Sequence, residues 1–96
     1  MKLKFNQIQD IEVMTPWGVE TKQVNSIIIN TITIYPQLKT AIVQYYKCND
    51  DGTNIQTYKI EDLFISDTEY ENIENFNELT ILNIIKEKEN IEGTIE

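Results

Sequence analysis

The sequence predicts an α+β domain: a small antiparallel β-sheet or β-sandwich of five or six strands with a C-terminal amphipathic helix. Residues 1–65 alternate polar and apolar residues in short runs, which is typical of strands with one buried face. Residues 49–52, NDDG, are a strong hairpin-turn signal between two such runs. Only residues 66–89 combine helix-capping residues with apolar residues at helical spacing. A length of 96 residues fits one domain.

The first strands are expected at residues 2–5 and 11–14, where polar and apolar residues alternate. A turn follows at Thr15–Gly18, because proline suits the second turn position and glycine the fourth. Alternation resumes at residues 19–24. The strongest strand signal is residues 26–35, SIIINTITIY, which is rich in β-branched residues and stops at Pro36.

Strict alternation assigns the residues of this strongest strand to two faces. Both faces are partly apolar, so the strand is either central to a sandwich or packed against another chain. One face would carry Ile28, Asn30, Ile32 and Ile34, and the other Ile27, Ile29, Thr31, Thr33 and Tyr35.

A β-hairpin is predicted over residues 40–60. The run TAIVQYYK forms its first strand, the Asp51-Gly52 pair supplies the turn, and Ile55–Ile60 returns. Residues 61–65 then lead across to the helix. Their apolar members, Leu63, Phe64 and Ile65, are expected to anchor that passage in the core.

Residues 66–89 are predicted to be helical. Ser66 and Glu69 form a capping-box pattern, and lysines at 86 and 88 suit the negative end of the helix dipole. Asparagines near 75–77 favour a break, after which Asn77 would cap a second helix running to about Lys88. Its apolar residues should pack on the sheet, and residues 90–96 are expected to form a mobile tail. These packing residues are Leu79, Ile81, Leu82, Ile84 and Ile85.

The charge is unevenly distributed along the chain. Residues 1–48 hold five lysines and three acids, whereas residues 49–96 hold three lysines and thirteen acids, within a net charge of −8. An acidic half repels nucleic acid and anionic membranes, so no direct contact with either is predicted. It is either a solvated face or a contact for a basic neighbouring subunit.

The residue types argue against catalysis and against bound cofactors. The chain contains no histidine and no arginine, which removes the usual proton shuttle near neutral pH and the bidentate clamp for phosphate. Cys48, the single cysteine, has no histidine partner to activate it, and it indicates a cytoplasmic protein without disulfides. Residues 49–54 lack the spacing of a calcium loop. No catalytic residue, metal ligand or cofactor-binding residue is therefore assigned.

Large apolar and aromatic residues are the remaining candidates for function. Tryptophan and tyrosine are enriched at protein interfaces, although in a thin domain they also form the core. The opening residues lack the apolar stretch of a signal peptide, and no apolar run is long enough to span a bilayer. The candidate interface residues are Trp17, Ile27, Ile29, Tyr35, Tyr46 and Tyr70.

The order of features resembles that of small structural proteins in the virions of tailed bacteriophages. An Asp-Gly hairpin is followed by ISDTEYENI and a short closing helix, and the resemblance covers about residues 27–86. Ser66, Asp67, Glu69 and Tyr70 fill the acidic stretch that leads to the closing helix in such proteins. Where a tryptophan often follows the tyrosine, this chain has Ile73 or Phe76. The resemblance implies an assembly protein and carries over no catalytic residue.

Two functions follow as expectations. The first is a non-enzymatic virion component of capsid, neck or tail, located in the virion and, during assembly, in the host cytoplasm. Its partners would be other virion proteins or further copies of itself. The alternative is an acidic intracellular binding or inhibitor module, whose carboxylates would occupy a basic site on a target protein.

Overall fold

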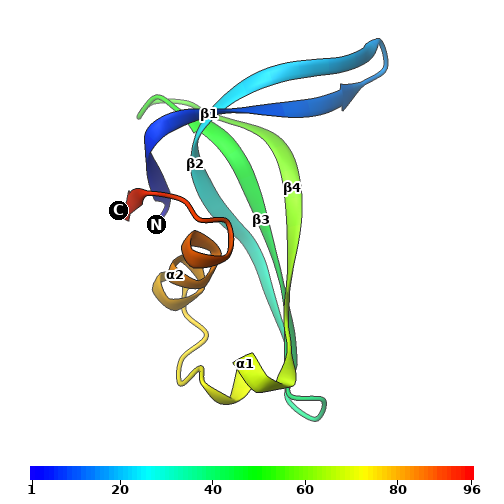
Figure 1. The fold of residues 1–96 in the computed structure, drawn as a ribbon, viewed down its shortest axis with the longest axis vertical. Coiled ribbons are helices and arrows are strands. Elements are labelled where there is room, and N and C mark those ends of the chain that lie inside the picture. The colour runs from blue at the N-terminus through cyan, green and yellow to red at the C-terminus, as the bar shows by residue number, and fades with distance from the viewer.

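A computed structural model describes residues 1–96 and contains one five-stranded antiparallel sheet with two short helices (Figure 1). The strands lie in the order β4-β3-β2-β1-β5. The α+β class and the antiparallel sheet are confirmed, and the strands form a single sheet. The elements are β1 (Leu3–Thr15), β2 (Gly18–Tyr35), β3 (Thr40–Asp50), β4 (Ile55–Ile65), α1 (Asp67–Glu71), α2 (Glu78–Lys88) and β5 (Gly93–Ile95).

The strands are longer than the sequence predicted. The two N-terminal runs are both part of β1, and the runs at 19–24 and 26–35 together form β2. Residues 61–65, expected to be a passage, continue β4. Within β1, Lys4 faces Ser26 while Gln9 faces Val24, so four residues of β1 oppose one residue of β2. An irregularity of this kind bends a strand, and β1 changes direction here.

A second bulge, at Asn30, overturns the predicted faces of β2. Ile29 faces Tyr45 and Thr31 faces Gln44, which leaves Asn30 without a partner residue. Each side chain after Asn30 therefore lies on the opposite face from the one that strict alternation assigns. As a result, one face of β2 collects most of the isoleucines. They are Ile27, Ile29, Ile32 and Ile34, whose partners in β3 and β1 include Ala41, Val43, Tyr45 and Leu3.

The core lies between this face of the sheet and α2. Figure 1 shows the strands curving around α2, so we call this the concave face and its reverse the convex face. Ile81, Leu82 and Ile85 are fully buried, as predicted, but Leu79 is exposed and Ile84 is half-buried. Phe64, expected in the core, is 58% exposed because it faces Ile42 on the convex face.

The helical region follows its capping signals. Ser66 precedes α1 and its hydroxyl accepts a hydrogen bond from the Glu69 N–H at 3.4 Å. Asn77 precedes α2 and accepts from the Thr80 N–H at 2.9 Å, as the sequence predicted. An N-cap side chain satisfies an amide that the helix leaves free. The break between the two helices therefore falls where the asparagines are concentrated.

The C-terminal residues differ from the predicted mobile tail. Asn90 takes a left-handed conformation (φ 54°), Ile91 is buried, and β5 pairs with the start of β1. Gly93 faces Phe5 at close range, because a Cβ added there would lie 2.3 Å from the carbonyl oxygen of Lys4. Only glycine permits this approach.

Residues 9–24 form a two-stranded arm that leaves the sheet (Figure 1). Over this length β1 and β2 pair only with each other, from Gln9–Val24 to Thr15–Gly18. The arm makes the molecule elongated, with extents of 42 × 30 × 23 Å. The radius of gyration is 14.3 Å, against about 12.5 Å for a compact domain of this length.

Candidate protein–protein interface

The tip of the arm is a defined turn that presents apolar side chains to water. The Thr15 hydroxyl donates to the Gly18 carbonyl at 2.9 Å and accepts from the Trp17 N–H at 3.2 Å. Gly18 has a φ of 123°, which a residue with a side chain rarely adopts. Trp17 is 93% exposed and Met14 is 82% exposed. We call Met14, Trp17 and Val19 the tip.

The root of the arm is held by Asp50 and Asn25. The Asn25 side-chain amide donates to the Asp50 carbonyl and accepts from the Asp50 N–H, each at 2.9 Å. These two bonds replace the backbone ladder at the point where β2 leaves β3. Lys2 forms an ion pair with the Asp50 carboxylate, and Lys4 Nζ donates to the Asp50 carbonyl at 3.1 Å. The arm therefore leaves the sheet at a fixed position.

The neighbours of Asp50 also stabilise the charged form of its carboxylate. A hydrogen bond from the Lys2 ammonium, assisted by the Gly52 N–H, holds the pKa of Asp50 below its ordinary value. Cys48 lies two residues earlier and is fully buried. Burial raises the pKa of the Cys48 thiol to about 11. Asp50 and Lys2 therefore fix the root of the arm. The Cys48 thiol is not an activated nucleophile, because its pKa is raised.

The arm also contacts the edge strand of the sheet. The Lys22 ammonium lies over the Tyr58 ring, 5.7 Å from its centroid, within the range of a cation–π interaction. Ile11, on the same side of the arm, is half-buried against the core. The arm is therefore anchored near its root, whereas its tip has no such support.

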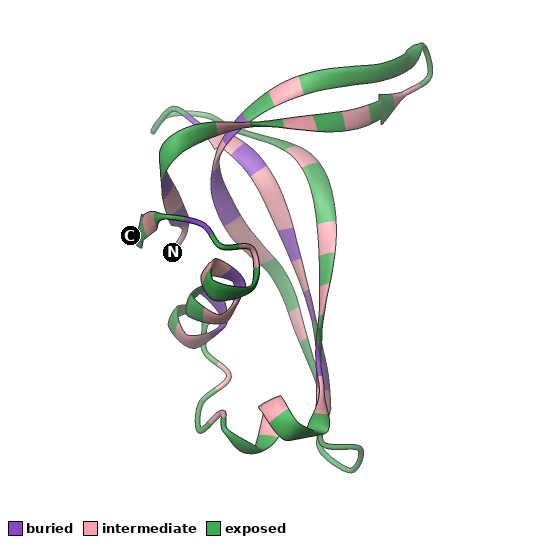
Figure 2. Cartoon of the chain, in the orientation of Figure 1, coloured by how far each residue is buried: buried purple, intermediate pink, exposed green.

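The convex face carries a second apolar surface. Ile42 pairs with Phe64, and Tyr46 pairs with Ile60. Ile60 and Phe64 are each more than half exposed. In Figure 2 most of the arm and much of β4 are exposed or intermediate, whereas buried residues lie mainly where the sheet faces α2. Figure 1 shows both helices on the opposite, concave side of the sheet.

A shallow cavity of about 440 Å³ lies at the loop between β2 and β3. Figure 1 shows this loop at the end of the molecule opposite the arm. Leu38 is 70% exposed there. The ammonium of the next residue, Lys39, forms an exposed ion pair with Glu71 at 3.8 Å. We call this cavity the loop pocket; its lining residues are Ile34, Tyr35, Pro36, Gln37 and Leu38.

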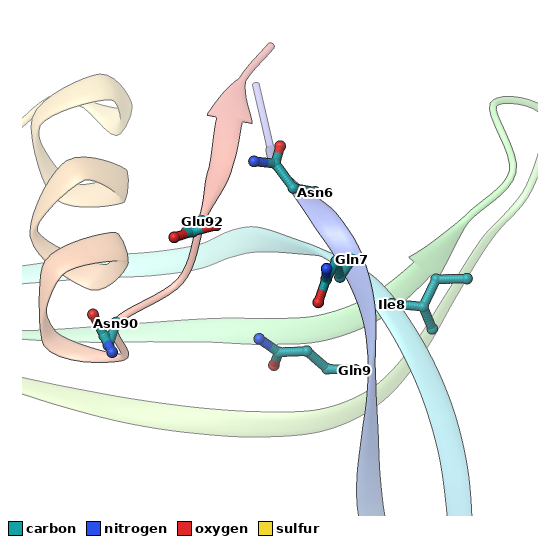
Figure 3. A pocket seen from close by; sticks show the side chains of 6 residues that line it. All are labelled: Asn6, Gln7, Ile8, Gln9, Asn90 and Glu92. Atoms are coloured by element: carbon teal, nitrogen blue, oxygen red, sulfur yellow. The ribbon is translucent and has the colours of Figure 1, made fainter.

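A different cavity, of about 260 Å³, lies beside the bend of β1 (Figure 3). Its lining is dominated by the amide side chains of Asn6, Gln7, Gln9 and Asn90, with the carboxylate of Glu92. Figure 3 shows Ile8 pointing away from the space between β1 and the turn that follows α2. These groups can donate and accept hydrogen bonds but provide no nucleophile or cluster of three metal-ligating side chains.

The structure separates the six residues predicted for an interface. Trp17 and Tyr35 are exposed, at the tip and at the loop pocket. Tyr46 is half-buried on the convex face, and Tyr70 is half-buried against Phe76, with ring centroids 5.1 Å apart. Ile29 is half-buried on the concave face. Ile27 is fully buried by this chain's own residues, so a partner cannot contact it.

Sequence reasoning missed several exposed apolar residues. Met14 and Val19 belong to the tip, but the sequence predicted ordinary strands for the runs that contain them. Alternation through residues 55–65 was the available signal for Ile60 and Phe64, since it places both on the face opposite Leu63. Leu38 stands in a loop and had no periodic pattern to reveal it.

Comparison with known proteins gives no relative for this chain: no protein-family model, curated protein or solved structure matches it. Neither helix is long and apolar enough to cross a membrane.

Proposed function

We propose that this protein is a non-enzymatic structural component of a tailed-phage virion, in capsid, neck or tail, and that it acts through protein–protein contacts. The observation that carries the proposal is the arm with its exposed apolar tip. Sixteen residues form this projection, of which only Val24 belongs to the buried core. Asn25 and Asp50 fix its root to the sheet.

Exposure of the tip to water costs free energy. A tryptophan side chain that is 93% exposed forgoes most of the hydrophobic stabilisation that burial would give. Tryptophan is among the residues that contribute most to binding when an interface buries them. A hydrogen-bonded turn that presents Trp17 therefore suits a contact in which a partner covers the tip.

The resemblance noted from the sequence supports the same proposal. The stretch from Ser66 to Tyr70 leads from the last long strand into the helical region, with Ser66 as a helix cap and Tyr70 packed on Phe76. α2 then packs on the concave face with Ile81, Leu82 and Ile85. The closing helix thus has a structural role, which leaves the arm and the convex face for partners.

Mass spectrometry of purified particles from the phage that encodes this chain tests the proposal. We expect its peptides at a fixed ratio to the major capsid or tail protein. Trp17→Ser should reduce that ratio, whereas Leu79→Ser, an exposed substitution on α2, should leave it unchanged. Absence of the wild-type chain from purified particles would contradict the proposal.

A specific surface favours the alternative, an acidic binding or inhibitor module. Asp67, Glu71, Glu74 and Glu78 are all exposed within twelve residues. A basic protein captured by the chain, and released when Glu71, Glu74 and Glu78 are replaced by glutamine, would support this alternative. The same release by Trp17→Ser would instead point to the arm.

A further inference from the structure

We propose that the arms of two copies pair edge to edge through β2 and form a four-stranded antiparallel sheet in the order β1-β2-β2-β1. This inference rests on the proposed function, in which the arm makes protein–protein contacts, and it names a second copy of the chain as the partner. Both copies use the same edge, so the contact has two-fold symmetry. The paired stretch is residues 19–23 of each copy.

The outer edge of β2 is free along the arm. Residues 18–24 pair only with β1, and the pairing of β2 with β3 starts at Ser26. No backbone hydrogen bond from another part of the chain reaches the outer groups of residues 19–23. In Figure 1, β2 is the upper strand of the arm, and β1 lies between this edge and β4. A row of unpaired N–H and C=O groups is a template for another strand.

The charges on β2 select one register for two copies. When residues 19–23 overlap completely, the two-fold axis passes through Thr21, so Thr21 opposes Thr21 and Glu20 opposes Lys22 in both directions. Threonine pairs and opposite charges each stabilise neighbouring strands. Moving the axis by one residue would place Glu20 opposite Glu20 or Lys22 opposite Lys22, and like charges in that position are destabilising. The edge is therefore complementary to itself in one register.

The ion pair already present in each chain is kept in this register. Glu20 and Lys22 lie on the same face of β2, with 3.3 Å between Oε2 and Nζ, and both side chains are partly exposed. Two such pairs side by side form a square of alternating charge. Each charged group then has an opposite charge along its own strand and another across the contact, so no ion pair has to break.

The other long free edges are less suited to self-pairing. Complete overlap of the neighbouring stretch of β1, residues 10–14, would place Glu12 opposite Glu12. In the proposed sheet β1 is the outer strand, so Asp10 and Glu12 stay away from the contact. The free edge of β4 has a bulge at Tyr58, which has no partner residue in β3. A bulge interrupts regular pairing, and natural proteins use it to protect an edge.

The same register also gives the tip a neighbour. Continued by two residues, it places Trp17 of one copy beside Asn25 of the other, at the root of that arm. Each tip would then lie against the other copy, which recovers part of the hydrophobic stabilisation that an exposed tryptophan lacks. About five backbone hydrogen bonds would cross between the two β2 strands.

Charge-swap variants test the register, with association measured by light scattering coupled to size-exclusion chromatography. Wild type should associate as its concentration rises to about 100 µM. Glu20→Lys alone and Lys22→Glu alone each place like charges opposite each other, so each should associate at least about fivefold more weakly. The double variant, Glu20→Lys with Lys22→Glu, restores opposite charges and should associate as wild type does.

A mixture of the two single variants gives a second test. The basic strand of the Glu20→Lys chain should pair with the acidic strand of the Lys22→Glu chain, giving a complex of two unlike chains. Glu12→Lys is the matched control, because it changes the net charge as much as Glu20→Lys but lies on β1, and it should not weaken association. General repulsion between acidic chains predicts the opposite for Glu20→Lys, since that variant is less negative than wild type.

Several results would overturn the inference. They are a wild type that stays monomeric, single variants that associate as wild type does, a double variant that does not recover, and a mixture that stays monomeric. Circular dichroism of each variant should match that of wild type, because only exposed or partly exposed side chains change. If a monomeric wild type is still found in purified particles, pairing between arms fails while the proposed function stands.

Discussion

At the scale of single residues, Asp50 connects three segments of the chain: the end of β3, the start of β1 and the part of β2 where the arm begins. Its backbone is bonded to the Asn25 side chain, its carboxylate to Lys2, and its carbonyl also to Lys4. One residue at the end of β3 therefore fixes the start of β1 and the point where β2 departs. Its ionisation should be coupled to stability.

Asp50→Asn should make the stability difference from wild type depend on pH. Lys2 and the Gly52 N–H stabilise the charged carboxylate, so the pKa of Asp50 is lowered in the folded state. The stability it adds is fully present above the ordinary carboxyl pKa of about 4 and is lost as pH falls through the lowered folded value. Urea unfolding at several pH values should show the variant less stable at pH 7 and the difference shrinking below about pH 4. A difference that is constant down to pH 2, or that Asp62→Asn reproduces, would refute this role.

Cys48 provides an independent probe of the same region. Its thiol is enclosed and donates to the Ser26 carbonyl at 3.4 Å, and burial raises its pKa to about 11. A thiol reagent at pH 8 should therefore label the native protein at least about 100-fold more slowly than the protein unfolded in urea. Similar labelling rates in the two states would show that this end of the sheet is open.

At the scale of elements, the packing of α2 and the pairing of β5 close the domain. α2 buries three side chains on the concave face, and β5 extends the sheet beyond β1. Each contact depends on a few closely packed residues, so single substitutions should weaken it.

The two faces of α2 should respond differently to truncation. Ile85→Ala removes a fully buried side chain and should cost about 2–5 kcal/mol of unfolding free energy. Leu79→Ala, on the exposed side, should change it by less than about 0.5 kcal/mol. Chemical denaturation measures both values. Equal effects would mean that α2 does not pack with the face described here.

Gly93→Ala tests the close approach of β5 to β1. The added Cβ would lie 2.3 Å from the Lys4 carbonyl oxygen, so the strands must separate. We expect a loss of about 1–3 kcal/mol and faster hydrogen exchange at the Lys2 and Glu96 amides, which bond across this pair. Thr94→Ala, exposed in the same strand, is the control. An unchanged exchange rate in Gly93→Ala would show that the pairing is looser than described.

At the scale of the whole molecule, local chemistry was readable from the sequence and long-range geometry was not. Ser66, Asn77, Pro36 and the Asp51-Gly52 turn act within a few residues, and each lies where the sequence predicted. The bulge at Asn30 depends on partners in another strand, and strict alternation therefore assigned the isoleucines of β2 to the wrong faces.

In the candidate interface too, the sequence predicted local features but not the contacts between distant residues. Trp17 was recognisable as a large ring beside a turn, and it lies exposed at the tip. Its setting on a projecting arm depends on the bend in β1 and the bonds between Asn25 and Asp50, which join residues 25 positions apart. The loop pocket likewise depends on where β2 and β3 end in the folded sheet.

In the free chain the tip lies in solvent, where a partner could cover it. Trp17 is the only tryptophan in the chain, so its fluorescence reports on the tip alone. We therefore propose to measure quenching of that fluorescence by acrylamide, at a dilution where light scattering finds a monomer. Quenching close to that of a free tryptophan amide is the predicted result. Quenching several-fold weaker in the monomer would show that Trp17 is covered by its own chain, and the account of the arm would be wrong.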